Sequence, residues 1–302
     1  MRQFIYKALS ILILVLLIDI IVGRISEHIC VNLSDKLSQI GSISQNLMKK
    51  KGDVVILGAS GAKYHYNCRI LSDSLQMEVQ NSGIKGMHAV YSDMVLQSFL
   101  QRQVPKCAVI DILGQLDAGD GFLPRVKPFY GISKPVTDYY DHETDWQQKL
   151  KLRSSLYRYN QTPDLFIRHL FNKDNTTNGF STKVQSVGRI DTIITTVFHP
   201  DSLQLRHLDH IVNLCQKHHI LLALVLSPRA EHNIATERWV TDYCKRNNIV
   251  LINEFHEPVY YERDDLFFDN SHLNNHGSEI FSKRIASQLK RIITDKKSNE
   301  KF

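Results

Sequence analysis

Apolar residues dominate the start of the chain. The run from Ala8 to Val22 is interrupted only by Ser10 and Asp19. Together with the apolar and aromatic residues 4–6, it is about long enough to cross a bilayer as one helix, at ~1.5 Å per residue. Asp19 lies near the end of the run, where a charge costs less than at its centre. This pattern predicts one membrane-spanning segment, and no other part of the sequence resembles a second.

The flanking charges indicate how such a segment would be oriented. Arg2 and Lys7 lie at its N-terminal side and favour a cytoplasmic N-terminus, although Arg24 on the far side opposes this. Residues 23–26 do not provide a small-x-small cleavage site. We therefore expect an uncleaved, single-pass signal anchor over residues 1–24 in the cell membrane, with the rest periplasmic or extracellular. A cleaved signal peptide and a buried helix of a cytoplasmic protein are the alternatives.

A polar segment follows the anchor over residues 25–52. Its apolar residues recur every three or four positions, which is the spacing of an amphipathic helix. They are Leu33, Leu37, Ile40, Ile43 and Leu47. The segment is thus predicted to be a helical stalk.

From Asp53 onward, short apolar runs alternate with amphipathic stretches. The predicted strands are 54–57, 77–81, 107–113, 220–226 and 249–252. The predicted helices are 62–75, 87–103, 203–218, 236–247 and 275–293. Such alternation predicts an α/β domain over 53–302, with a mostly parallel five-stranded sheet covered by helices on both faces.

The alternation breaks down between about residues 114 and 200. This stretch is rich in Pro, Tyr, Asp and Asn, and only 146–171 is predicted to be helical, at least in part. We interpret it as an insertion. Its aromatic residues could line a sugar-binding wall or lid, or they could simply form the core of the inserted part.

Composition narrows the class of protein. The 302 residues are 43% hydrophobic and 23% charged, which excludes wholesale disorder and a polytopic membrane protein. The formal net charge of +6 is spread along the chain, whereas nucleic-acid binding usually needs a concentrated basic face. No pair among the five cysteines has CxxC spacing, so neither a zinc site nor a disulfide scaffold is indicated. We expect no nucleic acid, no metal and no organic cofactor.

Two short segments carry the candidate chemistry. Gly58-Ala59-Ser60-Gly61 follows the first predicted strand, at the sheet edge where α/β proteins place their sites. Ser60 would lie at a helix N-terminus, which favours a developing anion, although Ser is also a common helix cap. Asp269 and His272 lie before the last helix, three residues apart, so the carboxylate could orient the imidazole. Alternatively, that segment is an ordinary polar loop.

Four other histidines compete for the role of base. They are His65, His88, His256 and His276. None of them has an acidic residue at the Asp-x-x-His spacing, so the sequence favours His272.

Taken together, the two segments resemble the SGNH/GDSL hydrolase superfamily, in which the nucleophile follows strand one and Asp-x-x-His precedes the C-terminal helix. Gly58-Ala59-Ser60 stands where that family carries Gly-Asp-Ser. Asn81-Ser82-Gly83 resembles the second block, in which the glycine offers its N–H to the oxyanion. The third block, Gly-x-Asn-Asp, corresponds to Gly114-Gln115-Leu116-Asp117, which lacks the asparagine. Gln115 is the candidate substitute donor.

The resemblance implies a flavodoxin-like three-layer α/β/α fold and a Ser-His-Asp triad of Ser60, His272 and Asp269. It also implies an oxyanion site built from the N–H groups of Ser60 and Gly83. With the anchor, the chain is similar to extracytoplasmic members linked to acylation of cell-surface polymers. The expected function is therefore a membrane-anchored serine esterase or O-acyltransferase acting on an acyl ester or acylated polysaccharide.

Two other functions remain open. The missing Gly-x-Asn-Asp block is compatible with an inactive scaffold that binds glycan or a membrane-bound O-acyltransferase. A cytoplasmic flavodoxin-like nucleotide binder is the third hypothesis, because Gly58-Ala59-Ser60-Gly61 could cradle a phosphate. The apolar N-terminus and the absence of a Gly-x-Gly-x-x-Gly sequence oppose it.

Overall fold

The chain forms two compact units in a computed structural model. Unit 1 comprises residues 1–49 and 123–173, and unit 2 comprises 50–122 and 174–302. The structure describes residues 1–32, 39–119, 121–160, 176–177, 180–181, 192–194, 197–229, 231–255, 257–260 and 263–299. Much of the predicted insertion thus belongs to the same unit as the predicted anchor and stalk.

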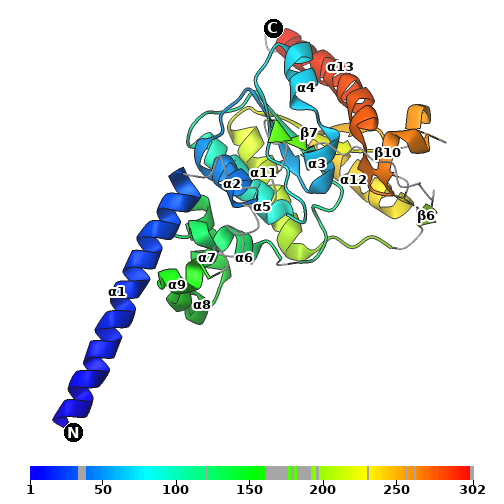
Figure 1. The fold of residues 1–302 in the computed structure, drawn as a ribbon. Coiled ribbons are helices and arrows are strands. Elements are labelled where there is room, and N and C mark those ends of the chain that lie inside the picture. Colours follow the sequence, from blue (N-terminus) through cyan, green and yellow to red (C-terminus); the bar gives the residue numbers. More distant parts are fainter. Residues whose placement is uncertain are drawn as a thin grey trace. The chain divides into compact units, whose positions relative to one another are not determined.

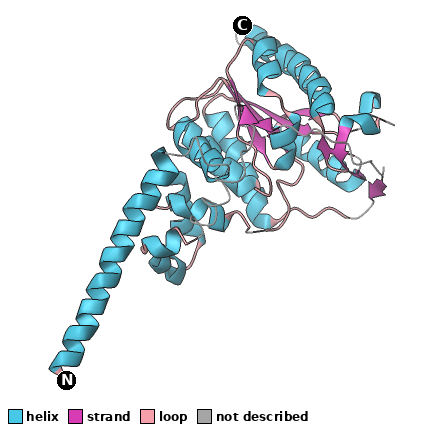
Figure 2. Cartoon of the chain, in the orientation of Figure 1, coloured by secondary structure: helices cyan, strands magenta, loops and turns pink. Residues whose placement is uncertain are grey.

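Unit 2 is built on a five-stranded, all-parallel sheet, as the sequence predicted (Figure 2). Its strands are β1 (Val54–Gly58), β2 (Val79–Asn81), β3 (Cys107–Asp111), β7 (Leu221–Leu226) and β9 (Val250–Asn253). They are ordered β2-β1-β3-β7-β9, which is the flavodoxin-like order. Since β1 and β3 are buried at every position, their sequences are continuous apolar runs rather than alternating ones.

Helices cover both faces of this sheet (Figure 1). The first group is α3 (Ser60–His65), α4 (Cys68–Leu75) and α13 (Asn275–Asn299). The second group is α5 (Ala89–Leu100), α11 (Ser202–Lys217) and α12 (Ile234–Asn247). Leu71 of α4 and Phe281 of α13 share the main core cluster with Val54 and Ile56 of β1. On the second group, Tyr243 of α12 donates a hydrogen bond to Asp209 of α11 at 2.7 Å.

One predicted helix and one predicted strand of unit 2 have different boundaries in the structure. The single helix expected over 62–75 is two helices, because the Asn67 side chain accepts from the N–H groups of Arg69 and Ile70 and starts a new helix there. The strand expected over 107–113 ends at Asp111. The remaining elements of unit 2 are β4 (Thr176–Thr177), β5 (Phe180–Ser181), β6 (Thr192–Ile194), β8 (Glu231–Asn233), η4 (Pro258–Tyr260), η5 (Asp264–Leu266), β10 (Phe267–Asp269) and β11 (His272–Leu273).

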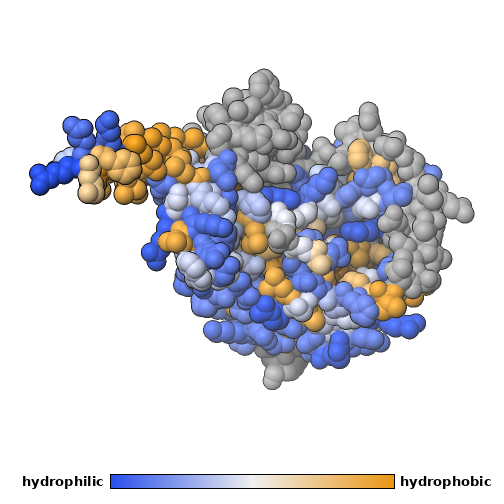
Figure 3. Space-filling model, turned by 90° about the horizontal axis from the view of Figure 1, so that it is seen from below, coloured by the Kyte–Doolittle hydropathy of each residue, from blue (hydrophilic) through white to orange (hydrophobic). Residues whose placement is uncertain are grey.

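Unit 1 is helical in the part that the structure describes. Its elements are α1 (Arg2–Asn32), α2 (Gln39–Ser44), η2 (Gln45–Lys49), α6 (Leu123–Val126), η3 (Lys127–Phe129), α7 (Lys134–Glu143), α8 (Trp146–Leu152) and α9 (Ser155–Arg158). α1 is the one described helix that is long and apolar enough to cross a membrane. Figure 3 shows its exposed length in orange, and its large apolar side chains from Phe4 to Ile21 are exposed.

Two predictions for this unit are only partly covered by the structure. Residues 33–38 of the predicted stalk helix lie outside the described residues, as does the end of the 146–171 prediction beyond residue 160. α1 continues past the predicted anchor boundary at residue 24 as far as Asn32. The helical character of both segments is seen where they are described.

Candidate active site

The position of Ser60 follows from the sharp turn between β1 and α3. Gly58 ends the strand with φ +147°, and a Cβ there would lie 2.7 Å from the Ala62 Cβ, so only glycine fits. Ala59 occupies the N-cap position of α3 without a side-chain hydrogen bond to the helix, and Ser60 is the first residue of the helix. The alternative in which Ser60 is itself the helix cap is therefore not what the structure shows. The Ser60 side chain therefore faces the carboxyl edge of the sheet.

Asp269 and His272 are brought together by the small hairpin of β10 and β11. The two residues are paired across this hairpin, with a bulge between Phe267 and Asp269. The Ser271 N–H donates to Asp269 Oδ1 at 2.8 Å, which closes the turn. Asp269 Oδ1 and Oδ2 lie 2.8 and 3.0 Å from His272 Nδ1.

The same imidazole reaches Ser60 with its other nitrogen. His272 Nε2 lies 2.7 Å from Ser60 Oγ, although 212 positions separate the two residues in sequence. With Nδ1–H donated to the carboxylate, Nε2 is the acceptor that faces the hydroxyl proton. Ser60, His272 and Asp269 are thus connected in the order that activates a serine nucleophile.

The charges at this site support that proton arrangement. Partial burial of Asp269 favours its neutral form, but the hydrogen bonds from His272 and from the Ser271 N–H outweigh this and lower the pKa of the carboxyl. A carboxylate that stays ionised stabilises the imidazolium when His272 takes a proton. The His272 side chain is only 15% exposed, whereas Asp269 is 42% exposed.

His65 lies behind His272 and was not predicted as part of the site. Its Nε2 accepts a hydrogen bond at 3.1 Å from the N–H of Leu273, the residue after His272. The two rings meet edge to face, with centroids 6.2 Å apart. Burial, with smaller contributions from His272 and Arg229, lowers the pKa of His65 well below its usual value, so this imidazole is neutral. It holds the strand that presents His272.

Asp111, the last residue of β3, was also missed. It is fully buried, and a Cβ on Gly61 would lie 2.9 Å from its Oδ2. The carboxyl therefore sits directly beneath the turn that carries Ser60. Burial raises its pKa to about 6, despite the opposing effect of Arg229. The sequence offered no signal beyond an acidic residue at the end of an apolar run.

The turn after β2 packs against α3, and the N–H of Gly83 in this turn already has a hydrogen-bond partner. A Cβ on Gly83 would lie 2.5 Å from the Ala62 Cβ and 2.6 Å from the Lys63 nitrogen, so the close packing needs glycine. The Gly83 N–H donates to Asn81 Oδ1 at 2.8 Å. Asn81 Nδ2 in turn donates to the Ala62 carbonyl at 2.6 Å. An oxyanion would have to compete with Asn81 for the Gly83 N–H, whose predicted role stays a prediction.

Gln115 was predicted as a substitute oxyanion donor, and that role stays a prediction. Its side-chain amide is buried, and both its oxygen and its nitrogen have hydrogen-bond partners. Ser92 Oγ donates to its Oε1 at 2.6 Å, and its Nε2 donates to the Met87 carbonyl at 3.1 Å. Because neither amide atom can be freed without leaving a buried partner unsatisfied, Gln115 anchors the start of α5.

The competing histidines have other environments. His88 Nδ1 lies 2.7 Å from the Gly114 carbonyl oxygen. His276 is exposed on the first turn of α13. His256 lies outside the described residues. Within the described part of the chain, no group of three or more His, Cys, Asp or Glu side chains could hold a metal ion.

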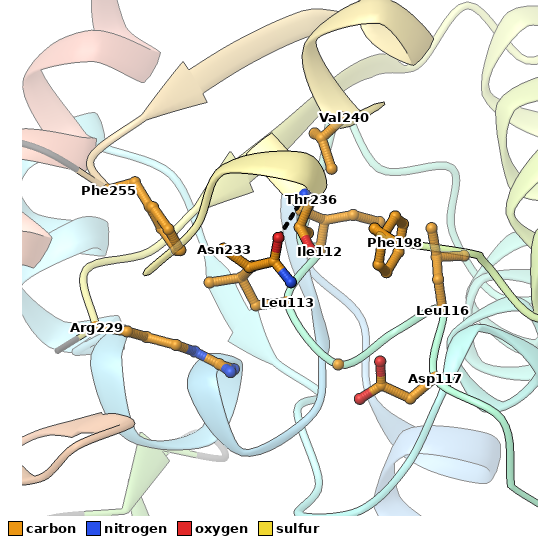
Figure 4. Close-up of a pocket in the computed structure, with 11 residues that line it drawn as sticks. Ile112, Leu113, Leu116, Asp117, Phe198, Arg229, Asn233, Thr236, Val240 and Phe255 are labelled. Carbon is orange, nitrogen blue, oxygen red and sulfur yellow. Dashed lines mark hydrogen bonds between the residues drawn. The ribbon is translucent and has the colours of Figure 1, made fainter. Parts of the chain in front are cut away.

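A pocket of about 200 Å³ opens at the carboxyl ends of β3, β7 and β9 (Figure 4). Its apolar lining is Ile112, Leu113, Leu116, Phe198, Val240 and Phe255. Arg229 and Asp117 contribute opposite charges from different sides of the pocket. Gly114, also in the lining, approaches the Ser60 turn, since a Cβ on it would lie 3.9 Å from the Ala59 Cβ. Ser60, His272 and Asp269 are not among the residues that line the pocket.

The fold and the site define an α/β protein with a Ser-His-Asp arrangement at the carboxyl edge of a parallel sheet. No family model and no curated protein matches the chain. Solved structures similar to it include one described as a lipolytic protein of the G-D-S-L family from Desulfitobacterium hafniense, with 12% identity, a TM-score of 0.41, and coverage of 78% of this chain and 98% of that one. Another, described as an acylhydrolase from Bacteroides fragilis, has 12% identity and a TM-score of 0.43, with 83% and 95% covered.

Proposed function

We propose that the chain is a membrane-anchored serine hydrolase of the ester-cleaving kind, acting as an esterase or as an O-acyltransferase. The observation that carries the proposal is the continuous contact from Asp269 through His272 to Ser60, with 2.8 Å and 2.7 Å between the bonded atoms. Three polar side chains from two separate segments meet in the order that nucleophilic catalysis needs.

The first half of the reaction forms an acyl-enzyme. Ser60 Oγ attacks the ester carbonyl carbon while its proton passes to His272 Nε2. The tetrahedral oxyanion then collapses, the acyl C–O bond breaks, and the leaving alkoxide takes the proton from His272. Asp269 stays ionised and stabilises the imidazolium between these two proton transfers.

The second half regenerates Ser60. Water, or a hydroxyl of an acceptor, gives its proton to His272 and attacks the acyl carbon. Collapse of this second intermediate expels Ser60, which takes the proton back. Water as the acceptor gives hydrolysis and an alcohol gives acyl transfer, so the same three residues serve both outcomes. No metal or organic cofactor takes part in the proposed steps.

The oxyanion site is the least complete part of this proposal. The Ser60 N–H lies in the first turn of α3, and the Gly83 N–H would join it on release from Asn81. Losing one such donor typically lowers kcat by about 10²–10³-fold. With Gln115 engaged elsewhere, we expect slow turnover of simple esters.

The substrate side of the proposal rests on the pocket and on α1. A pocket of about 200 Å³, whose lining residue Gly114 lies near Ala59 in the turn before Ser60, suits a short acyl group, with apolar side chains to receive it. An apolar, exposed α1 would hold the protein at the cell membrane, with the catalytic unit outside the cytoplasm. We propose an acylated cell-surface polysaccharide as substrate or acceptor, with a membrane-bound O-acyltransferase as a partner.

A second candidate function is a catalytically inactive scaffold that binds a glycan or that acyltransferase. The observations that favour it are the missing third oxyanion donor and the bond from the Gly83 N–H to Asn81. Such a protein would keep its biological function after Ser60→Ala.

Covalent labelling of the full chain in mild detergent tests the proposal. A fluorophosphonate probe should label the wild type, while Ser60→Ala and His272→Ala should lose the label. Ser202→Ala is the matched control, because Ser202 also begins a helix and should not be labelled. Absence of label on a folded, monodisperse wild type would favour the scaffold.

A further inference from the structure

Asp19, the one charged residue inside the apolar run of α1, makes three hydrogen bonds within unit 1. Ser154 Oγ donates to its carboxylate at 2.6 Å, and the N–H groups of Ser155 and Leu156 donate at 3.0 and 2.8 Å. These N–H groups belong to the first turn of α9, where they have no partner inside that helix. Asp19 therefore fixes the start of α9 on α1.

The side of α1 that faces α9 is shaped for this contact. A Cβ on Gly23 would lie 2.4 Å from Ser155 Oγ, so any larger residue would push α9 away. Gly23 and Cys30 are the buried residues of α1. With Asp19 they fall at positions 0, 4 and 11, which lie on one face of a helix. α9 is thus attached where the apolar run of α1 ends.

A partly apolar surface without cover lies next to this attachment. We call it the α8 face, and it consists of Trp146, Leu150, Arg153 and Leu156. Trp146 is 69% exposed, Leu150 57% and Leu156 39%. Trp146, Leu150 and Arg153 are spaced by four and three residues, so they share one side of α8, while Leu152 is buried on another. Within unit 1, α9 contacts α1, and α8 contacts α9 (Figure 1).

The charged side chains of residues 146–158, which include the α8 face, are all positive. Lys149, Lys151 and Arg153 follow Trp146 within seven residues, and the last two are exposed. The nearest acid, Asp145, is engaged as the cap of α8, accepting from the Gln148 N–H at 2.7 Å. Two further acids, Asp141 and Glu143, precede it on α7, and Asp141 accepts from Tyr130.

We propose that the α8 face is a second membrane contact, which lies in the headgroup region of an anionic phospholipid bilayer when α1 is inserted. An exposed tryptophan beside leucines suits the boundary between hydrocarbon and headgroups. Lysine and arginine next to it are attracted by anionic lipid. The α8 face adjoins α1 where α1 would leave the hydrocarbon, so a single bilayer can contact both. The proposal rests on the anchoring part of the proposed function and not on the chemistry of Ser60.

Tryptophan fluorescence of the full chain in vesicles tests this. The sequence has two tryptophans, so Trp239→Phe leaves Trp146 as the sole reporter. The protein is reconstituted into phosphatidylcholine vesicles with and without phosphatidylglycerol, and bound protein is collected by flotation. Phospholipids brominated along the acyl chain should quench Trp146, and aqueous iodide should not. Phosphatidylglycerol should strengthen the bromolipid quenching.

Charge variants sharpen the measurement. Removing the cations with Lys149→Gln, Lys151→Gln and Arg153→Gln together should abolish the phosphatidylglycerol effect. Lys245→Gln with Arg246→Gln, on α12 of unit 2, is the matched control and should leave it unchanged. Fluorophosphonate labelling of Ser60 should be the same in all of these variants, because none of the altered residues touches the site.

Each outcome separates the proposals. Protein that does not float with vesicles overturns both the anchor and the α8 face. Protein that floats, with Trp146 open to iodide and not to bromolipid, overturns the α8 face and leaves the anchor standing. Protection of Trp146 from both quenchers also overturns it and indicates a protein partner instead. Loss of Ser60 labelling in the wild type bears on the catalytic proposal alone.

Discussion

Unit 2 contains two Asp–His arrangements that look alike by their hydrogen bonds and differ in what surrounds them. Asp269 pairs with His272 at 2.8 Å, and Asp93 of α5 pairs with His207 at 2.6 Å and His210 at 2.9 Å, both on α11. In each case the carboxylate contacts Nδ1. In the first, the far nitrogen meets the Ser60 hydroxyl. In the second, two imidazoles converge on one carboxylate and connect two helices.

Burial is distributed in opposite ways in the two arrangements. The Asp93 side chain is 1% exposed and that of His210 is 47% exposed, whereas Asp269 is 42% exposed and His272 15%. A buried carboxylate that contacts two imidazoles, one of them 17% and the other 47% exposed, serves to attach α5 to α11. A sheltered imidazole with a serine on one side and a wetter carboxylate on the other can exchange protons with a substrate. The Asp–His pair alone therefore does not distinguish the candidate catalytic site from the helix contact, whereas the contact of His272 with Ser60 does.

The largest difference in kcat between the two arrangements should come from substituting their histidines. We expect His272→Gln to lower kcat for p-nitrophenyl acetate by on the order of 10⁶-fold, as loss of the base does in serine hydrolases. His207→Gln should leave kcat within about twofold, because His207 bonds to Asp93 in the contact between α11 and α5. Steady-state kinetics with folded fractions matched by circular dichroism would measure this. Equal losses in the two variants would place catalysis elsewhere.

Variants of the two carboxylates should also differ in kcat, but by a smaller factor. Asp269→Asn keeps the shape but allows the amide to favour the wrong imidazole tautomer, so we expect kcat to fall by about 10⁴-fold. Asp93→Asn, tested in the same assay, should not change kcat. A pH profile adds a second readout, because without the carboxylate the imidazolium is less stable, so the acid limb of the remaining activity of Asp269→Asn should shift toward lower pH. An unchanged rate in Asp269→Asn would contradict the assigned orientation of His272.

The comparison also shows what a sequence can and cannot predict. Ser60 and the Asp269–His272 pair were found because each lies in a short segment with a chemical signature, at the end of a predicted strand or before a predicted helix. The order of strands and helices was predicted because buried parallel strands are continuous apolar runs. The structure confirms that five-stranded sheet.

Side-chain partners distant in sequence were beyond prediction. The partners of Gln115, Ser92 and the Met87 carbonyl, lie 23 and 28 positions away and gave no local signal. Asp111 gave no local signal either, since its effect depends on its burial beneath Gly61. The break at Asn67 was missed because a single capping side chain outweighed an otherwise helical pattern.

For the free energy of unfolding, we expect the opposite order from kcat: substituting Asp93 should cost more than substituting Asp269. Asp93→Ala removes a buried acceptor of bonds from His207, His210 and Gln97, and bonds to charged groups each contribute about 1.5–3 kcal/mol. We expect its free energy of unfolding to fall by at least one such amount. Asp269→Ala, at a more exposed carboxylate, should cost less than about 1 kcal/mol. Urea unfolding monitored by the signal of unit 2 would give both values, and a larger loss in Asp269→Ala would reverse the proposed division of roles.

The smallest expected effect is on how stability depends on pH, and it follows from the same cluster. The hydrogen bond to Asp93 raises the pKa of His210 above its usual value. Burial works to raise the pKa of Asp93, but the bonds from His207 and His210 outweigh it and lower that pKa. The His210 contribution is therefore complete below about pH 6.5 and is lost as the pH rises through the raised pKa. The Asp93 contribution is lost only as the pH falls below about 4.

Since His210 is 47% exposed, water and salt screen most of its charge. Between pH 6 and 8.5 we expect the wild-type melting temperature to fall by about one degree more than that of His210→Gln, and 1 M salt should remove the difference. His276→Gln is the control, since His276 is an exposed histidine on the first turn of α13. Identical pH slopes for wild type and His210→Gln at low salt would mean that the Asp93 cluster holds its two helices through neutral hydrogen bonds alone.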